Sequence, residues 1–204
     1  MLPGDIYLTP IKKTRCHFTI KGSRFVATMA PSLSVASARD ILASVNAEFS
    51  DATHHTYAYR IGAAGNLVER SFDDGEPAGT AGLPMLQILQ GNNVSDAIVI
   101  GTRYFGGTRL GIGGLTRAYR DCARLCLEKA VLIEKEPINK YLLELSYEDF
   151  GSVSKIIENK EGKIITVDYG KEVIVTVSIP VRTSDAFMAD FDSVCRGRGI
   201  SRQH

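Results

Sequence analysis

The feature that most constrains this chain is a glycine-rich stretch at residues 103–117, RYFGGTRLGIGGLTR. Five of the nine residues 106–114 are glycines: Gly106, Gly107, Gly111, Gly113 and Gly114. Glycine costs conformational entropy wherever it is not needed, so this density indicates positive φ angles or a close approach of the backbone to something else. An apolar run ending at Ile100 precedes the stretch, and an amphipathic pattern over 115–130 follows it. The sequence therefore predicts a strand, a glycine-rich loop and a helix.

Such a loop is a natural anion site, because the first turn of a helix presents unpaired N–H groups and the positive end of the helix dipole. Three arginines lie in or beside it: Arg103, Arg109 and Arg117. The stretch matches neither standard nucleotide motif. Ile112 and Gly113 stand where a P-loop has Lys and Ser or Thr, and Thr116 stands where the dinucleotide fingerprint has its third glycine. Both a phosphate-binding loop and a tight turn for strand–helix packing remain open.

A second stretch, DDGEPAGTAG at residues 73–82, places three carboxylates within four residues: Asp73, Asp74 and Glu76. Mg²⁺ prefers oxygen ligands beside a substrate phosphate, so a metal site is one interpretation. The composition is also typical of a solvated turn. A third interpretation pairs these carboxylates with Arg103 or Arg109, which would fix the two loops to each other. We favour the turn or the ion pair over the metal, and we assign no metal and no cofactor.

The two stretches, in their order and spacing, resemble the IMPACT family in its bacterial YigZ-type form. The resemblance extends over the whole chain and is densest at residues 54–130. It implies a role around translation and its regulation, since eukaryotic relatives restrain a kinase that phosphorylates a translation initiation factor. On the residues of this chain, it directs attention to the glycine-rich loop and to the acidic loop opposite it.

For residues 1–131 the hydrophobic periodicity predicts the order ββαββαβα. The expected strands are 14–20, 24–30, 54–61, 66–72 and 96–104, and the expected helices begin after Ser34, near Leu83 and at Leu115. By resemblance this is the two-layer α/β half of a small-subunit ribosomal protein and of the GHMP kinases. We expect a mixed sheet with its helices on one face.

Residues 132–139, which include Pro137, predict a linker. The order βαββα follows in residues 140–204, with strands at 140–147, 162–169 and 172–180 and helices at 150–160 and 183–196. This order resembles a ferredoxin-like domain, whose closing strand would have to come from 199–204. The expected fold class is thus α+β with two domains.

Composition excludes some classes of protein. The net charge is +1, with 24 Lys and Arg against 23 Asp and Glu, which is not the basic body of a strong non-specific nucleic-acid binder. No stretch is apolar and long enough for a membrane span. The four cysteines, Cys16, Cys122, Cys126 and Cys195, lack CxxC spacing and predict buried thiols in a reducing cytoplasm.

Other constellations give weaker signals. Arg117, Arg120 and Arg124 form a basic stripe on the helix, which ordinary solvation with Asp121 and Glu128 would explain. His54 and His55 are adjacent in a strand and point to opposite faces, so they do not share a metal. The C-terminal arginines, Arg196, Arg198 and Arg202, predict a solvated end. No nucleophile with a base and no defined carboxylate pair can be assigned, so we name no catalytic residue.

We therefore expect a non-catalytic cytoplasmic binding protein linked to translation. RNA, a ribosome-associated factor or another phosphate-bearing ligand would contact the glycine-rich loop, with no membrane association and no evident DNA specificity. Two other functions stay open. One is a Mg²⁺-dependent enzyme acting on a nucleotide or a phosphorylated small molecule, and the other is an adaptor that binds a protein through the ferredoxin-like sheet.

Overall fold

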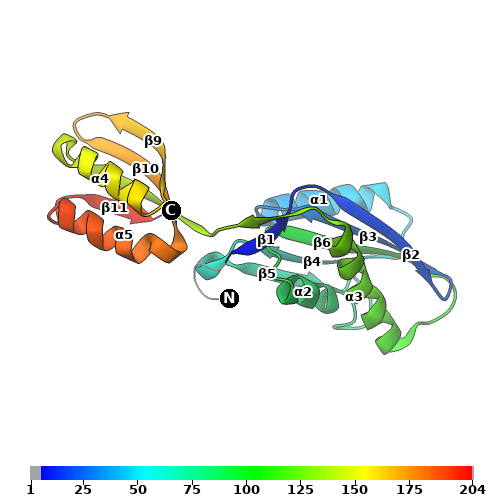
Figure 1. Ribbon diagram of the computed structural model, residues 1–204. Coiled ribbons are helices and arrows are strands. Elements are labelled where there is room, and N and C mark those ends of the chain that lie inside the picture. Colours follow the sequence, from blue (N-terminus) through cyan, green and yellow to red (C-terminus); the bar gives the residue numbers. More distant parts are fainter. Residues whose placement is uncertain (1–5, 204) are drawn as a thin grey trace. The chain divides into compact units, whose positions relative to one another are not determined.

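The computed structural model describes residues 6–203, and the chain divides into two compact units (Figure 1). The first unit is Tyr7–Lys135, and the second begins at Glu136. Residues 132–139, expected to be a linker, instead contain strand β7 (Leu132–Lys135) and the start of strand β8 (Ile138–Leu145). No helix among the described residues is long and apolar enough to cross a membrane.

The first unit is built on a five-stranded sheet with the order β2-β3-β6-β4-β5. Its strands are β2 (Thr14–Ile20), β3 (Ser23–Pro31), β4 (His54–Ile61), β5 (Val68–Phe72) and β6 (Ala97–Tyr104). A short 3₁₀ turn, η1 (Ala64–Asn66), lies in the connection between β4 and β5. Every neighbouring pair is antiparallel, so the expected mixed sheet is wrong. The predicted hairpins β2–β3 and β4–β5 are confirmed.

Helices cover both faces of this sheet, not one as expected (Figure 1). Ile98 and Ile100 of β6 pack in one cluster with helix α1 (Val35–Glu48), which Ser34 caps through its side chain. The alternate β6 residues Ala97 and Val99 pack in another cluster with helices α2 (Gly82–Gly91) and α3 (Gly111–Lys129). A strand buried on both faces carries a continuous apolar run, and the run AIVI at 97–100 is that signal.

A small two-stranded sheet was not predicted. Strand β1 (Tyr7–Pro10) pairs antiparallel with β7. Asp96 lies between this sheet and the larger one: its Oδ2 accepts hydrogen bonds from Tyr7 Oη (2.7 Å) and Lys135 Nζ, and its Oδ1 accepts from the N–H of Gly62 (2.9 Å). One buried carboxylate thus holds β1, β7 and the β4–β5 connection together.

The second unit has the order β8, α4, β9, β10, α5, β11 and the sheet order β11-β8-β10-β9, all antiparallel. After β8, its elements are α4 (Tyr147–Asn159), β9 (Lys163–Tyr169), β10 (Val173–Pro180), α5 (Val181–Val194) and β11 (Ile200–Gln203). The ferredoxin-like order is confirmed, and β11 closes the sheet against β8. The buried core includes Leu143, Val175, Phe187 and Phe191.

Candidate functional site

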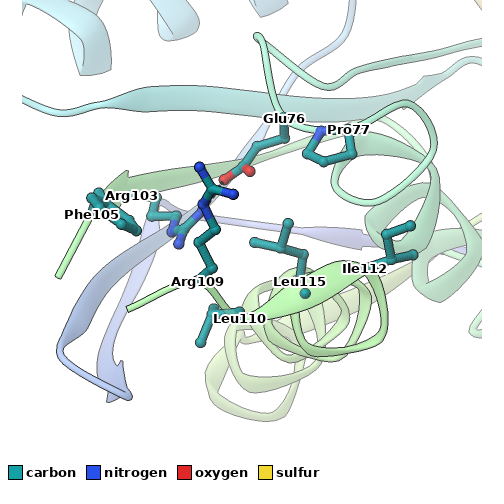
Figure 2. Close-up of a pocket in the computed structure, with 9 residues that line it drawn as sticks. Glu76, Pro77, Arg103, Phe105, Arg109, Leu110, Ile112 and Leu115 are labelled. Atoms are coloured by element: carbon teal, nitrogen blue, oxygen red, sulfur yellow. Dashed lines mark hydrogen bonds and ion pairs between the residues drawn. The ribbon is translucent and has the colours of Figure 1, made fainter. Parts of the chain in front are cut away.

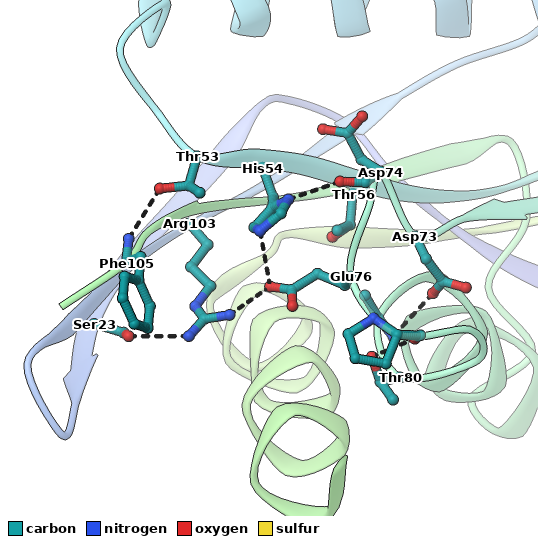
Figure 3. Close-up of polar contacts among 12 residues, drawn as sticks. Ser23, Thr53, His54, Thr56, Asp73, Asp74, Glu76, Thr80, Arg103 and Phe105 are labelled. Carbon is teal, nitrogen blue, oxygen red and sulfur yellow. Dashed lines mark hydrogen bonds and ion pairs between the residues drawn. The ribbon is translucent and has the colours of Figure 1, made fainter. Parts of the chain in front are cut away.

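The acidic loop and the strand before the glycine-rich loop meet in a buried ion pair. Glu76 Oε1 accepts hydrogen bonds from Arg103 Nη1 (2.7 Å) and from the hydroxyl of Tyr119 (2.7 Å), as Figure 3 shows for the arginine. Arg103 also donates from Nη2 to Ser23 Oγ (3.2 Å) in the β2–β3 turn. Of the three interpretations of the acidic loop, the ion pair is thus present for Glu76 and Arg103. The pair joins both loops to α3.

The other two carboxylates of the loop bind backbone. Asp73 accepts hydrogen bonds from the N–H groups of Gly79 (2.8 Å), Ala81 (3.0 Å) and Gly82 (2.9 Å), so it closes the loop and caps the start of α2. Asp74 Oδ2 accepts from the N–H of His55 (2.6 Å). Each carboxylate therefore has a structural partner of its own. Within residues 6–203, no three His, Cys, Asp or Glu side chains are grouped as metal ligands.

The two adjacent histidines diverge as expected. His54 Nδ1 lies 2.7 Å from the carbonyl oxygen of Asp74, and its Nε2 lies 3.8 Å from Glu76 Oε1 (Figure 3). His55 Nδ1 lies 3.2 Å from Thr102 Oγ1. His54 is therefore part of the polar cluster around Glu76, whereas His55 is not.

Tyr119 lies on the buried face of α3, and its hydroxyl makes it a member of this cluster. Burial, reinforced by the charge of the adjacent Glu76 carboxylate and by the hydrogen bond to it, raises the pKa of the Tyr119 phenol far above its usual range. Tyr119 consequently remains a neutral donor to Glu76. Gly101 on strand β6 makes room for the Tyr119 ring, because a Cβ at this position would lie 2.9 Å from the ring carbons.

Three of the five glycines are required by the fold. A Cβ on Gly106 would lie 1.9 Å from the carbonyl carbon of Gly22, so the loop packs directly on the β2–β3 turn. Gly107 has φ +83° and Gly111 has φ +72°, values that side-chain-bearing residues rarely adopt. The tight-turn interpretation therefore accounts for these positions. It leaves Gly113 and Gly114 to be explained.

Helix α3 begins at Gly111, four residues earlier than expected, so Gly111, Gly113 and Gly114 lie in its first turn and not in the preceding loop. A Cβ at Gly114 would approach the Cβ of Leu110 to 3.0 Å. At Gly113 the nearest atom would be Arg117 Nη1, at 4.0 Å. Helical glycine costs about 1 kcal/mol relative to alanine. Packing gives no reason for the glycine at 113.

The N-terminus of α3 is open. Its N-cap residue, Leu110, offers no side-chain hydrogen bond, and its first turn holds no acidic residue. Arg109 and Arg117 are exposed, and neither guanidinium forms a hydrogen bond or ion pair within the described part of the chain. The 4.0 Å approach of Arg117 Nη1 to the Gly113 Cβ position brings that guanidinium back to the first turn. Two unpaired cations thus flank the free N–H groups.

A pocket of about 340 Å³ lies beside this helix end (Figure 2). Arg103, Arg109 and Glu76 supply its polar groups, and Phe105 stands next to the arginines in the same view. The remaining lining residues are Pro77, Leu110, Gly111, Ile112 and Leu115. The sequence did not identify Phe105 and Ile112 as site residues. They differ from neighbouring apolar residues only in being exposed in the folded protein, which the sequence does not reveal.

Some residues considered from the sequence lie outside this site. Arg124 pairs with Asp121 (3.1 Å) and Glu128 (2.6 Å), which makes it part of an ordinary solvated helix face. The C-terminal arginines belong to the second unit, where Arg198 Nη2 lies 3.8 Å from Asp149. The four cysteines are buried and unpaired.

Comparison with known proteins gives a consistent result for both units. The family described as the Impact N-terminal domain matches residues 21–127, and the Domain of unknown function (DUF1949) matches residues 143–198. Escherichia coli IMPACT family member YigZ is 37% identical over 194 residues, which is 95% of each chain. Bacillus subtilis IMPACT family member YvyE is 27% identical over 192 residues, 94% of this chain and 88% of the relative.

A rat relative and a solved structure extend the comparison. Rattus norvegicus Protein IMPACT is 32% identical over 148 residues, which is 71% of this chain and 44% of the rat protein. A solved structure titled "Crystal structure of an hypothetical protein" aligns over 98% of this chain and 97% of its own, with a TM-score of 0.69 and 33% identity. On these matches, the chain belongs to the IMPACT family.

Proposed function

We propose that this protein is a non-catalytic cytoplasmic binding protein that receives the phosphates of RNA, or of another phosphate-bearing ligand, at the N-terminus of α3. One observation carries the proposal: the helix end is uncapped, and Arg109 and Arg117 beside it have no partner among the described residues. Free N–H groups, the positive end of the helix dipole and unpaired guanidinium groups are what a phosphate needs.

The residues of the predicted site divide into two roles under this proposal. Arg109, Arg117 and the first turn of α3 with Gly113 contact the phosphate. Arg103 is already paired with Glu76, so it positions the loops and adds no net charge. Gly106 and Gly107 let the loop turn beside the β2–β3 hairpin, and they act on the ligand only through that geometry.

The link to translation follows from family resemblance, and an RNA ligand would support it. A chain with a net charge of +1 offers few phosphate contacts outside a local patch. Binding should therefore involve only a few nucleotides of the RNA. Its affinity should depend less steeply on salt concentration than that of a strongly basic protein.

The test is the affinity for a short single-stranded RNA, measured over a series of salt concentrations. Arg109→Ala and Arg117→Ala should each weaken binding and reduce the slope of log K against log salt by about 0.7, the value of one phosphate contact on a single strand. Arg39→Ala is the matched control, because Arg39 is an exposed arginine on α1, on the opposite face of the sheet, with no partner among residues 6–203. Unchanged affinity and slope in both site variants would contradict the proposal.

A further inference from the structure

We propose that the pocket beside α3 takes one unstacked nucleobase, so that the ligand of this site is a nucleotide whose base enters the pocket while its phosphate sits at the helix end. This inference rests on the proposed function and names its ligand class. The occupant is a flat aromatic ring system with a hydrogen-bond donor on its edge, attached to a phosphate.

The walls of the pocket suit a base better than a phosphate alone. Phe105 is 49% exposed and Ile112 is 70% exposed, although both are large and apolar. Leu110 and Leu115 continue the apolar lining, and the volume of about 340 Å³ falls within the range of small-molecule sites. A phosphate makes no favourable contact with such apolar walls, whereas any of the four bases can stack on an aromatic ring.

Glu76 gives the pocket an unused hydrogen-bond acceptor. Its side chain is 4% exposed, and Oε1 already accepts from Arg103 and Tyr119. Its second oxygen, Oε2, accepts no hydrogen bond from the described residues. Because Glu76 lines the pocket, an amino group or ring N–H of a base can donate a hydrogen bond to this free oxygen. A phosphate, which offers mainly acceptors, would be repelled from this end and directed to Arg109 and α3.

Phe105 is held in place before any ligand arrives. Its backbone N–H donates to Thr53 Oγ1 (3.0 Å), and the guanidinium carbon of Arg103 lies 5.5 Å from its ring centroid. Arg103 is 4% exposed, and its Nε has no acceptor among the described residues. This end of the pocket therefore has unused hydrogen-bonding capacity of both signs beside a fixed, exposed ring. Pre-organisation of this kind lowers the entropic cost of binding.

The experiment compares two oligomers of equal length and charge, a single-stranded RNA and the same backbone without bases, together with the four 5′-mononucleotides. Phe105→Ala should weaken binding of the RNA about tenfold and leave binding of the abasic backbone unchanged. Phe72→Ala is the matched control, because Phe72 is 48% exposed on β5 and does not line the pocket. Thermal unfolding of each variant verifies that it is folded.

A direct readout is available because the chain has no tryptophan. The fluorescence of a 2-aminopurine placed in the RNA should change on binding to the wild type and to Phe72→Ala, but not on binding to Phe105→Ala. Equal affinity of the RNA and the abasic backbone, or an unchanged RNA affinity in Phe105→Ala, would overturn the inference. If Arg109→Ala still weakened both oligomers in that case, the proposed function would stand without the base pocket. If neither oligomer and no mononucleotide bound, both would fall. Saturable binding of a mononucleotide would identify a single nucleotide as a sufficient ligand.

Discussion

Gly106 and Gly113 lie seven residues apart and have opposite reasons for being glycine. A side chain at Gly106 would overlap the Gly22 backbone at 1.9 Å, whereas the space around Gly113 is open. Gly106→Ala should therefore lower the free energy of unfolding by about 3 kcal/mol, as overpacking does. Gly113→Ala should raise it by up to about 1 kcal/mol while weakening RNA binding, because the new methyl group covers the helix end. Urea unfolding measures both, and stabilisation by the first or destabilisation by the second would refute this assignment.

The buried Arg103–Glu76 ion pair holds the acidic loop against strand β6 beneath the pocket. Arg103→Met leaves Glu76 buried without its cation, which should cost about 3–5 kcal/mol of unfolding free energy. Arg124→Met removes the same charge from an ion pair on an exposed helix face and should leave the free energy of unfolding almost unchanged. Chemical denaturation of the two variants tests the contrast. Equal effects would mean that the buried pair is not a structural element of the loops.

Residue types alone predicted the content of the site but not its contacts. The glycine density and the three arginines indicated an anion site, and the acidic loop raised an ion pair as one of three interpretations. Which carboxylate pairs with which arginine depends on the packing of β4, β6 and α3. Tyr119 shows the same limit, since its position on an apolar helix face does not reveal that its hydroxyl reaches Glu76.

At the scale of elements, Asp96 controls how the small β1–β7 sheet is attached. Burial opposes the ionisation of Asp96, but the hydrogen bonds from Lys135, the Gly62 N–H and Tyr7 outweigh it and lower the pKa of the carboxyl below its ordinary value of 3.8. A carboxyl whose pKa is lower in the folded state contributes stability above its unfolded pKa and loses it as the pH falls through the folded pKa. This contribution should therefore be complete at neutral pH and lost progressively below about pH 4.

Asp96→Asn tests that attachment while keeping the local conformation, because Asp96 has φ +52° and asparagine also tolerates this region. The variant should be about 1–3 kcal/mol less stable at pH 7, since a charged acceptor of three hydrogen bonds is lost. The difference from the wild type should shrink as the pH falls below 4. Denaturation measured at several pH values checks this, and a difference independent of pH would contradict it.

Sequence periodicity located most elements of both units, because amphipathic helices and hairpins are specified locally. It missed β1 and β7, which are four residues long and depend on pairing between distant segments. It also placed the start of α3 at Leu115, because glycines are poor helix formers and the first turn at Gly111 has no capping side chain. Interactions outside the segment decide both features.

At the scale of the whole molecule, each unit has a hydrophobic core of its own. The first unit has two hydrophobic clusters. One contains Met85 and Tyr119, and the other contains Val45 and Ile98. The cluster with Phe187 and Phe191 belongs to the second. The candidate site lies entirely in the first unit, on β4, β6, α3 and the loops between them. The proposed ligand therefore requires no residue of the ferredoxin-like unit.

The most direct test of this account is an NMR titration of the uniformly ¹⁵N-labelled protein with a short single-stranded RNA. The largest amide shifts should occur at Gly107 and at residues 111–114, with a second group at Phe105 and the backbone around Glu76. Amides of β8, β10 and β11 should change little, and Arg109→Ala should abolish the shifts at 111–114. Shifts confined to the second unit, or an unchanged pattern in Arg109→Ala, would contradict the claim that the N-terminus of α3 is the phosphate site.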